Sequence, residues 1–226
     1  MTDTRLKNLK TSWAPLHERT YQELKTAIMS GKFMPGEKLT VRGLSEELGV
    51  SAMPARAAIL RLAAEKALDL SGTSGSASIP LLTKSRFNEM YELRVLLEGR
   101  ATERAARQMT KKDFSELQQL LVELETASVR GNSDKYLEVN QRFKFKIFQS
   151  ADQPVLEDLI ERLWMQIGPF MRFYGKGIMD LRVDRHKTAL SALIARDGVT
   201  ARSALEADVK EGATFLLTNA EFAEEA

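Results

Sequence analysis

Cysteine is absent from this chain of 226 residues, and only two histidines are present. Without cysteine the chain forms no disulfide and no thiolate zinc site, which is compatible with a reducing cytoplasm. Long hydrophobic runs are also missing, since no stretch approaches the roughly 20 apolar residues that a membrane helix requires. The first ten residues are polar and lack the apolar segment of a signal peptide. We therefore expect a cytoplasmic protein with no membrane contact and few possible catalytic or metal-binding arrangements.

Positive charge is present in slight excess, and it is unevenly distributed. The formal net charge of the whole chain is +2. Residues 1–80 hold 11 lysines and arginines against 8 acidic residues, whereas the remainder is close to neutral. A basic N-terminal part is a weak indication of a polyanionic partner such as nucleic acid.

A segment of small residues divides the chain into two parts. Residues 71–78 contain only serine, glycine, threonine and alanine, and Pro80 follows them. From Lys84 onward, amphipathic helical patterns follow one another, separated by short breakers that contain glycine, asparagine or proline. We therefore expect a mostly α protein with a disordered tail at 1–13, a small mixed domain at 14–80 and an all-helical bundle at 84–222.

The small domain shows three helical patterns followed by a hairpin. Apolar periodicity predicts helices at 19–30, 41–48 and 51–66, with Gly31 capping the first of them and a turn at 33–37. Short apolar stretches at 68–70 and 77–79 predict two strands joined by the glycine-serine segment. Three helices followed by a small two-stranded wing are the order of a winged helix-turn-helix.

The middle of the small domain has the residue spacing of a helix-turn-helix. Ser45 is small enough to let two helices approach, and Gly49 can adopt the positive φ of a tight turn. The next helix, with Ser51 as its expected N-cap, presents Ser51, Met53 and Arg56 towards a major groove. A helix–glycine–helix corner also occurs in proteins that bind no DNA, but the three-helix order, the wing and the positive charge favour DNA binding.

Four motifs of this domain occur in a specific order. They are Ile28-Met29-Ser30-Gly31, Pro35-Gly36-Glu37-Lys38-Leu39, Leu44-Ser45-Glu46-Glu47-Leu48-Gly49-Val50-Ser51 and Pro54-Ala55-Arg56. With them, residues 19–80 resemble the DNA-binding domain of the GntR family of regulators. The resemblance implies that double-stranded operator DNA is contacted by Arg42, Ser51, Met53, Arg56 and the wing residues Thr73 and Ser74. Ala52 departs from the family, which usually has an operator-contacting arginine there, so we expect a different half-site or weaker binding.

Polar side chains interrupt the apolar faces of several helices in the second part. The first of these helices has an apolar stripe with Arg94 on it, formed by Phe87, Met90, Leu97 and Ala101. The other polar residues on predicted core faces are Asn140, Lys144, His186 and Asp208. A buried charge is unfavourable unless paired, so these residues contact one another or line a cavity, unless they reach solvent at the edge of a stripe. Further candidates for the wall of such a cavity are Trp164, Arg172 and Tyr174, although such aromatic residues are more often part of a core.

The second part resembles the all-helical ligand-binding domain of the FadR branch of the GntR family. The matching segments are Tyr91-Glu92-Leu93-Arg94-Val95-Leu96-Leu97-Glu98, Asn140-Gln141-Arg142-Phe143-Lys144, His186, and Ala201-Arg202-Ser203-Ala204 leading to Asp208. Many members of that branch bind a metal ion such as zinc through an Asp, a His one turn later and two further His. The corresponding residues here are Asn140, Lys144, His186 and Asp208. A neutral amide and an ammonium make a poor divalent site, so we expect no metal and no cofactor.

These patterns predict a homodimeric transcriptional regulator, which we expect to be a repressor and not an enzyme. The resemblance and the cationic side chains favour a small anionic effector, such as an organic acid, bound by Arg94, Asn140, Lys144, His186 and Asp208. An acyl-CoA, as bound by the metal-free fatty-acid regulator of this branch, is an alternative. Two other functions stay open. One is an architectural DNA-binding protein whose helical domain only dimerises. The other is an enzyme with His186 and Asp208 as an acid–base pair, which leaves the winged helix unexplained.

Overall fold

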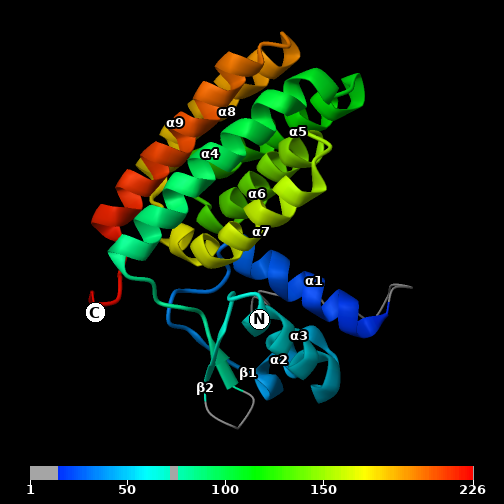
Figure 1. The fold of residues 1–226 in the computed structure, drawn as a ribbon, viewed down its shortest axis with the longest axis vertical. Coiled ribbons are helices and arrows are strands. Elements are labelled where there is room, and N and C mark those ends of the chain that lie inside the picture. Colours follow the sequence, from blue (N-terminus) through cyan, green and yellow to red (C-terminus); the bar gives the residue numbers. More distant parts are fainter. Residues whose placement is uncertain (1–14, 72–75, 226) are drawn as a thin grey trace.

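The computed structural model describes residues 15–71 and 76–225, which form a small N-terminal domain and a helical bundle above it (Figure 1). The small domain contains three helices, which are α1 (Leu16–Met29), α2 (Val41–Leu48) and α3 (Ala52–Ala64). Its strands are β1 (Lys38–Thr40), β2 (Asp69–Ser71) and β3 (Ser76–Ser78). The winged helix-turn-helix architecture predicted from the sequence is therefore confirmed, whereas the predicted tail at 1–13 lies outside the described residues.

The sheet has one strand more than the predicted two-stranded wing. Its order is β1-β3-β2, with both pairings antiparallel, and Leu39 and Leu70 both lie opposite Ala77. Leu39 and Ala77 are buried, so β1 ties the region before α2 to the wing. The strand follows the tight turn at Gly36, whose φ is +77°. The sequence analysis missed β1, because its three residues become a strand only by pairing with β3, far along the chain.

The turn between α2 and α3 has the geometry predicted from the sequence. Gly49 ends α2 with a φ of 66°, and Gly31 follows α1 with a φ of 67°. Both values are in the left-handed region, which glycine adopts at little cost. Ser51 stands at the N-cap of α3 as predicted, but its side chain makes no capping hydrogen bond. The Ser51 hydroxyl therefore does not stabilise the first turn of α3, the helix that is predicted to enter the major groove.

The second domain is an all-α bundle, as predicted. Its helices are α4 (Lys84–Gln108), α5 (Lys111–Val129), α6 (Ser133–Gln149), α7 (Pro154–Ile167), the 3-10 helix η1 (Gly168–Phe173), α8 (Lys176–Ile194) and α9 (Gly198–Asn219). Helix α9 packs along both α4 and α8, and α5 packs against α6 and α8 (Figure 1). Among the described residues, no helix combines the length and apolarity needed to span a bilayer.

One residue of the apolar stripe predicted for α4 is not buried. Phe87, Met90, Arg94 and Ala101 are buried as expected, but Leu97 is only half-buried and Glu98 is fully buried instead. The buried residue that follows Arg94 on this face is therefore four positions later (Glu98) and not three (Leu97). A search for apolar periodicity selects the leucine, because a carboxylate is rarely found in a core without a partner.

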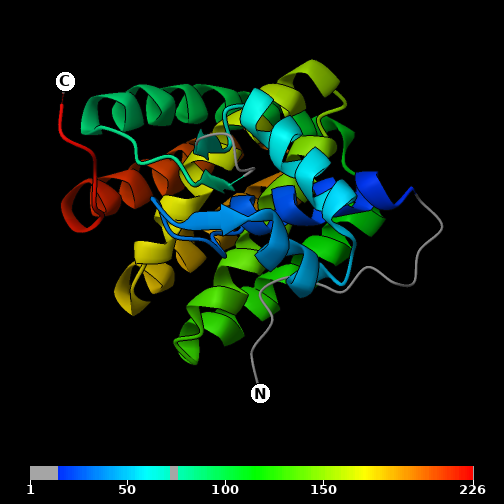
Figure 2. The ribbon, with the colours of Figure 1, turned by 90° about the horizontal axis from the view of Figure 1, so that it is seen from below.

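The small domain rests on the bundle through α1, which contacts α7 and η1. Figure 2, seen from below, shows the small domain lying across this end of the bundle. At the contact, Lys25 on α1 forms an ion pair with Glu161 on α7. Gly168 lies so close to α1 that an added Cβ would come within 2.6 Å of the Met29 carbonyl oxygen. The two domains are thus in direct backbone contact.

Candidate functional sites

The exposed face of α3 carries the side chains predicted to contact a major groove. Ser51, Met53 and Arg56 are exposed, and 82% of the Met53 surface is accessible. On the opposite face, Pro54 and Ala55 are buried against the rest of the domain. The side chains that were predicted to face DNA therefore lie on the exposed side of α3. That they contact DNA stays a prediction. The predicted wing residues Thr73 and Ser74 lie outside the described residues.

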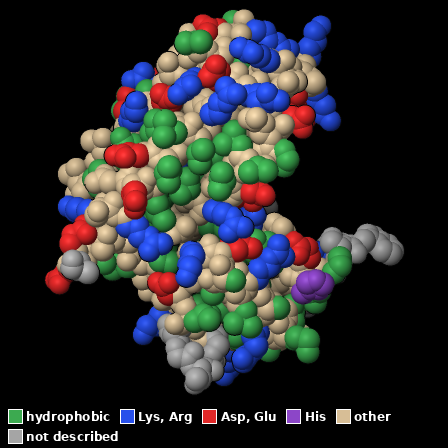
Figure 3. Space-filling view, in the orientation of Figure 1, with side chains coloured by type: hydrophobic (Ala, Val, Ile, Leu, Met, Phe, Trp, Pro, Cys, Tyr) green, Lys and Arg blue, Asp and Glu red, His purple; other side chains and the backbone are tan. Residues whose placement is uncertain are grey.

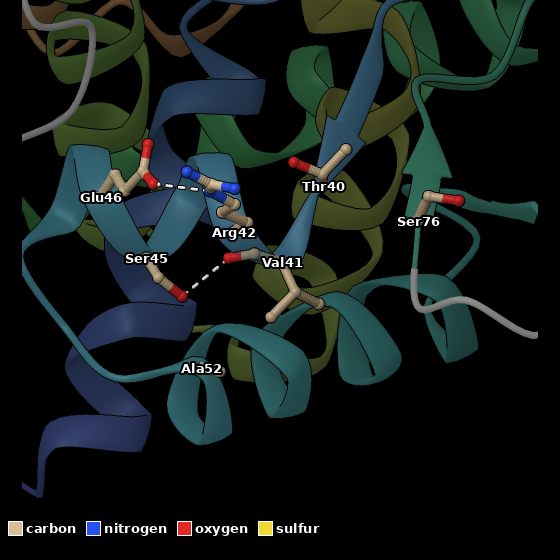
Figure 4. A pocket seen from close by; sticks show the side chains of 7 residues that line it. All are labelled: Thr40, Val41, Arg42, Ser45, Glu46, Ala52 and Ser76. Atoms are coloured by element: carbon tan, nitrogen blue, oxygen red, sulfur yellow. Dashed lines mark hydrogen bonds and ion pairs between the residues drawn. The ribbon is translucent and has the colours of Figure 1, made fainter.

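A groove beside this helix gathers residues of α2, the start of α3 and the sheet (Figure 4). It is lined by Thr40, Val41, Arg42, Ser45, Glu46, Ala52 and Ser76. Arg42 Nε donates a hydrogen bond to Glu46 Oε1 at 2.9 Å, across one turn of α2. The guanidinium that the resemblance assigns to DNA is thus held by a carboxylate in the free protein. The short Ala52 side chain contributes no charge to this groove.

The five polar residues predicted for the effector site are all buried in the bundle. Arg94 is 4% exposed, and Asn140, Lys144, His186 and Asp208 are 0% exposed. The alternative that they reach solvent at stripe edges is therefore wrong. Lys144 Nζ lies 2.5 Å from Asp208 Oδ2, so two of the five residues contact each other directly. The structure brings these side chains together from α4, α6, α8 and α9.

Two charged residues that the sequence analysis did not select complete this cluster. Glu98 accepts hydrogen bonds from Arg94 Nε at 2.7 Å and from Lys144 Nζ at 3.0 Å. Arg182 donates two hydrogen bonds to Asp208, from Nε at 2.7 Å and from Nη2 at 3.0 Å. Each missed residue lies four positions from a selected one, since Glu98 follows Arg94 and Arg182 precedes His186. This spacing on one helix face is the pattern that would have revealed them.

Of the three further candidates for the wall of the site, the two aromatic residues contact the cluster and Arg172 does not. Trp164 Nε1 donates to Glu98 Oε1 at 2.8 Å, and the Tyr174 ring lies 4.7 Å from the Arg182 guanidinium. Both aromatic residues are buried and belong to the wall of the cluster. Arg172 instead forms an ion pair with Asp134, which is largely exposed. We therefore exclude Arg172 from the candidate site.

The buried cluster carries more positive than negative charge. Its cations are Arg94, Lys144 and Arg182, and its anions are Glu98 and Asp208. Burial raises the pKa of both carboxyl groups, but their cationic neighbours outweigh it and hold each pKa below its ordinary value. Both are therefore ionised at neutral pH, and one positive charge remains in excess. An excess buried charge is unfavourable unless an anion balances it.

His186 contributes no charge to this balance at neutral pH. Burial lowers the pKa of its imidazole to about 4. Its Nδ1 lies 2.5 Å from the backbone oxygen of Arg182, so Nδ1 donates and Nε2 has a free lone pair. His186 is therefore a neutral hydrogen-bond acceptor within a cationic environment.

Several buried polar atoms in this region have no hydrogen-bond partner among residues 15–71 and 76–225. They are Tyr136 Oη, both amide atoms of Asn140, Arg182 Nη1 and His186 Nε2. Tyr136, Asn140 and Lys144 follow one another at four-residue spacing on α6, and Arg182 and His186 do so on α8. The set combines donors with acceptors, and buried groups of this kind are nearly always satisfied in folded proteins.

The side chains do not fit the divalent metal ion that the resemblance to the FadR branch implies for these positions. The Lys144 ammonium lies between Glu98 and Asp208, so a fixed positive charge already occupies the place between the two carboxylates. Of the four positions that correspond to the metal ligands, only His186 and Asp208 carry ordinary ligands, beside the neutral amide of Asn140. A divalent cation at this point would be repelled by Lys144 and Arg182.

Comparison with known proteins identifies both halves of the chain. Residues 16–77 match the family model described as bacterial regulatory proteins, gntR family, and residues 89–211 match the FCD domain. The chain is 30% identical over 198 residues to the HTH-type transcriptional regulator McbR of Escherichia coli K12. This match covers 86% of the chain and 89% of McbR. The chain is also 25% identical to the HTH-type transcriptional repressor RspR of the same strain, over 87% of each protein.

A solved structure shows the same arrangement of the two domains. The structure of E. coli McbR/YncC superposes with a TM-score of 0.85 at 28% identity, covering 91% of this chain and 99% of that one. Both the family and the similar proteins are transcriptional regulators. The enzyme alternative, with His186 and Asp208 as an acid–base pair, is therefore not supported.

Proposed function

Because this chain belongs to the gntR family of bacterial transcriptional regulators, with an FCD domain after its winged helix, we propose that a small organic anion controls its affinity for an operator. The anion binds within the buried cluster, and the protein acts in the cytoplasm as a homodimeric repressor. The observation that carries this proposal is the excess positive charge of the cluster, next to buried polar atoms without a partner.

The unpartnered atoms specify the chemistry of the effector. Arg182 Nη1 and Asn140 Nδ2 are donors suited to a carboxylate. His186 Nε2 and Asn140 Oδ1 are acceptors, and a hydroxyl group on the same molecule would donate its one hydrogen bond to one of them. A small acid with a hydroxyl group supplies both functions at once and balances the excess charge. Lys144 takes the place of a metal ion by fixing positive charge between the two carboxylates.

The winged helix is the part that binds DNA. Residues Ser51, Met53 and Arg56 on the exposed face of α3 enter the major groove, and Arg42 leaves Glu46 to contact the backbone or a base. A homodimer contacts two half-sites, which adds the phosphate contacts that one small domain lacks. Ala52 cannot form the hydrogen bonds of an arginine, so the preferred half-site differs from the usual one of the family.

Helix α7 connects the two sites. Trp164 on α7 donates to Glu98 in the cluster, and Glu161, one turn earlier, pairs with Lys25 on α1. Because the backbone of Gly168 touches the end of α1, a displacement of α7 moves α1 with it. An anion that changes the position of Glu98 thereby shifts the orientation of the winged helix, which couples the two binding free energies.

Asn140 provides the most direct experiment, because its side chain makes no hydrogen bond to the described parts of the chain that a substitution could break. Small hydroxy acids and simple carboxylic acids are added to wild-type protein and to Asn140→Leu, and thermal unfolding and operator mobility shift are measured. We expect a hydroxy acid to stabilise the wild type and change its DNA affinity. Asn140→Leu should lose both responses while its unfolding temperature without ligand stays equal or rises, since a buried unsatisfied amide is removed.

The matched control is Asn132→Leu, a change of the exposed asparagine before α6. It removes a helix cap, so its own stability should fall, but its response to the acid should persist. If no acid stabilises the wild type at millimolar concentration while operator binding is intact, the bundle only dimerises and the architectural alternative is correct.

A further inference from the structure

The first turns of α3 expose apolar side chains where a helix that reads bases usually carries polar ones. Met53 is 82% exposed, and Ala52 and Ala57 are exposed as well. Between Ala52 and Leu60, a stretch that the structure describes in full, Arg56 is the sole charged residue. Figure 3 shows hydrophobic side chains next to lysines and arginines on the visible face of the small domain, in the lower part of the view. Few side chains of this helix face can therefore form hydrogen bonds with bases, and the others are suited to apolar contacts.

Ala52 lies at the groove between α2 and α3. Val41, half-buried at the start of α2, lines the same groove (Figure 4). These two side chains give part of the groove an apolar surface, while Arg42 and Glu46 form an ion pair with each other. The N-terminal residues of a recognition helix are the ones that contact base edges. Ala52 and Met53, the first two residues of α3, are therefore placed to meet the bases.

We propose that Ala52 and Met53 recognise thymine in the operator through its C5 methyl group. This methyl is the one apolar group on the base edges of the major groove, where the other groups are hydrogen-bond donors and acceptors. Contact with it removes apolar surface of both partners from water. The thioether side chain of Met53 is unbranched and flexible, so it adapts to the position of the methyl group. The half-site should therefore contain thymine where an arginine at position 52 would favour guanine.

The charges around these apolar residues favour DNA over a protein partner. Arg56 lies one turn after Ala52 on the same exposed face, and Arg42 borders the groove. Guanidinium groups bind phosphates and the acceptor atoms of guanine, so they flank the apolar surface with groups suited to DNA. The inference rests on the operator binding of the proposed function, and it adds the base that the apolar residues read.

Uracil substitution tests the contact, because uracil lacks the C5 methyl group and keeps every hydrogen-bonding group of thymine. An operator is selected from random DNA with the full-length protein, and the thymines of its half-site are replaced one at a time. Mobility shift then measures the affinity of each operator. At one or two thymines we expect binding to weaken by about fourfold, which corresponds to the loss of one buried methyl group.

Substitutions of Met53 assign this effect to its side chain, whose exposure leaves the core of the domain unchanged. Met53→Gln should reduce the difference between the thymine and uracil operators, whereas Met53→Leu should keep it. The matched control is Leu60→Ala, a change of an exposed apolar residue two turns later on α3, which should also keep the difference. Ala52→Arg should change the selected base at one position of the half-site from thymine to guanine.

The outcomes separate this inference from the proposed function. If uracil changes the affinity at no thymine of the half-site, the inference is refuted, operator binding is intact, and the apolar residues face another partner. If the uracil effect is unchanged in both Met53→Gln and Ala52→Arg, it arises from the shape of the DNA, which also refutes the inference. If the wild-type protein selects no DNA sequence, the operator binding of the proposed function and this inference both fail.

Discussion

Asp208 and Lys144 belong to the same buried ion pair, but their removal should have unequal effects on stability. Asp208→Asn leaves Arg94, Lys144 and Arg182 against Glu98 alone, so two buried positive charges are uncompensated. Breaking a buried pair in this way typically costs about 3–5 kcal/mol. The free energy of unfolding of Asp208→Asn should fall by an amount in this range.

Lys144→Met leaves the cluster electrically balanced. The pairs Arg94–Glu98 and Arg182–Asp208 both remain, and the methionine fills much of the volume of the lysine stem. Two hydrogen bonds to charged groups are lost, each contributing about 1.5–3 kcal/mol. The folded protein no longer buries an ammonium, which offsets several kcal/mol of that loss. The net decrease in the free energy of unfolding should therefore stay below about 2 kcal/mol.

Urea denaturation followed by circular dichroism at pH 7 measures the difference between these two variants. Lys146→Met is the control on the same helix. Its ammonium also bridges two carboxylates, at 2.7 Å from Asp113 and 2.6 Å from Glu116, but its side chain is 25% exposed. Its loss should cost less than about 1 kcal/mol. If Lys144→Met is as destabilising as Asp208→Asn, the cluster has no excess positive charge and the argument for an anionic effector fails.

Three further predictions concern His186 and the DNA-binding surface. Burial lowers the pKa of His186 in the folded protein from its ordinary value of 6.5 to about 4. Between these two pH values the unfolded chain therefore binds more protons than the folded protein. The free energy of unfolding should therefore fall between pH 6.5 and pH 4, by up to roughly 3 kcal/mol, and a His186→Gln variant with the same slope in urea titrations would contradict this. Glu46→Gln should tighten operator binding in a mobility shift at low salt, since it releases Arg42, and an unchanged affinity would argue against a role for Arg42. Arg56→Ala should weaken operator binding by about tenfold or more, whereas Leu60→Ala on the same exposed surface should not.

Local features of the DNA-binding domain followed from the sequence, because they depend on neighbouring residues. The left-handed turn at Gly49 and the outward orientation of Arg56 needed only the conformational freedom of glycine and the period of a helix. Strand β1 was missed, because three residues around Leu39 become a strand only by hydrogen bonding to Ser76–Ser78, far along the chain.

In the bundle, helical periodicity predicted the burial of Arg94, Asn140, Lys144, His186 and Asp208. Whether a residue faces the core is a property of its own helix, and a polar residue on an apolar stripe is recognisable without any partner. A search for apolar periodicity alone favoured Leu97 over Glu98 and did not select Arg182, although each charged residue lies four positions from a selected polar one. A charged residue enters a core only when partners from other helices satisfy it, and those partners are not visible in the pattern of one helix.

Only the tertiary structure decided which buried charges meet. It placed Lys144 between Glu98 on α4 and Asp208 on α9, and it aligned Arg182 on α8 with the same aspartate. These contacts set the charge balance and the unpartnered atoms from which the effector chemistry is inferred. The sequence determined the family, the two domains and the polar positions within the core. The pairing depended on packing between helices distant in sequence, because electrostatic energy depends on distances in space that helical periodicity does not specify.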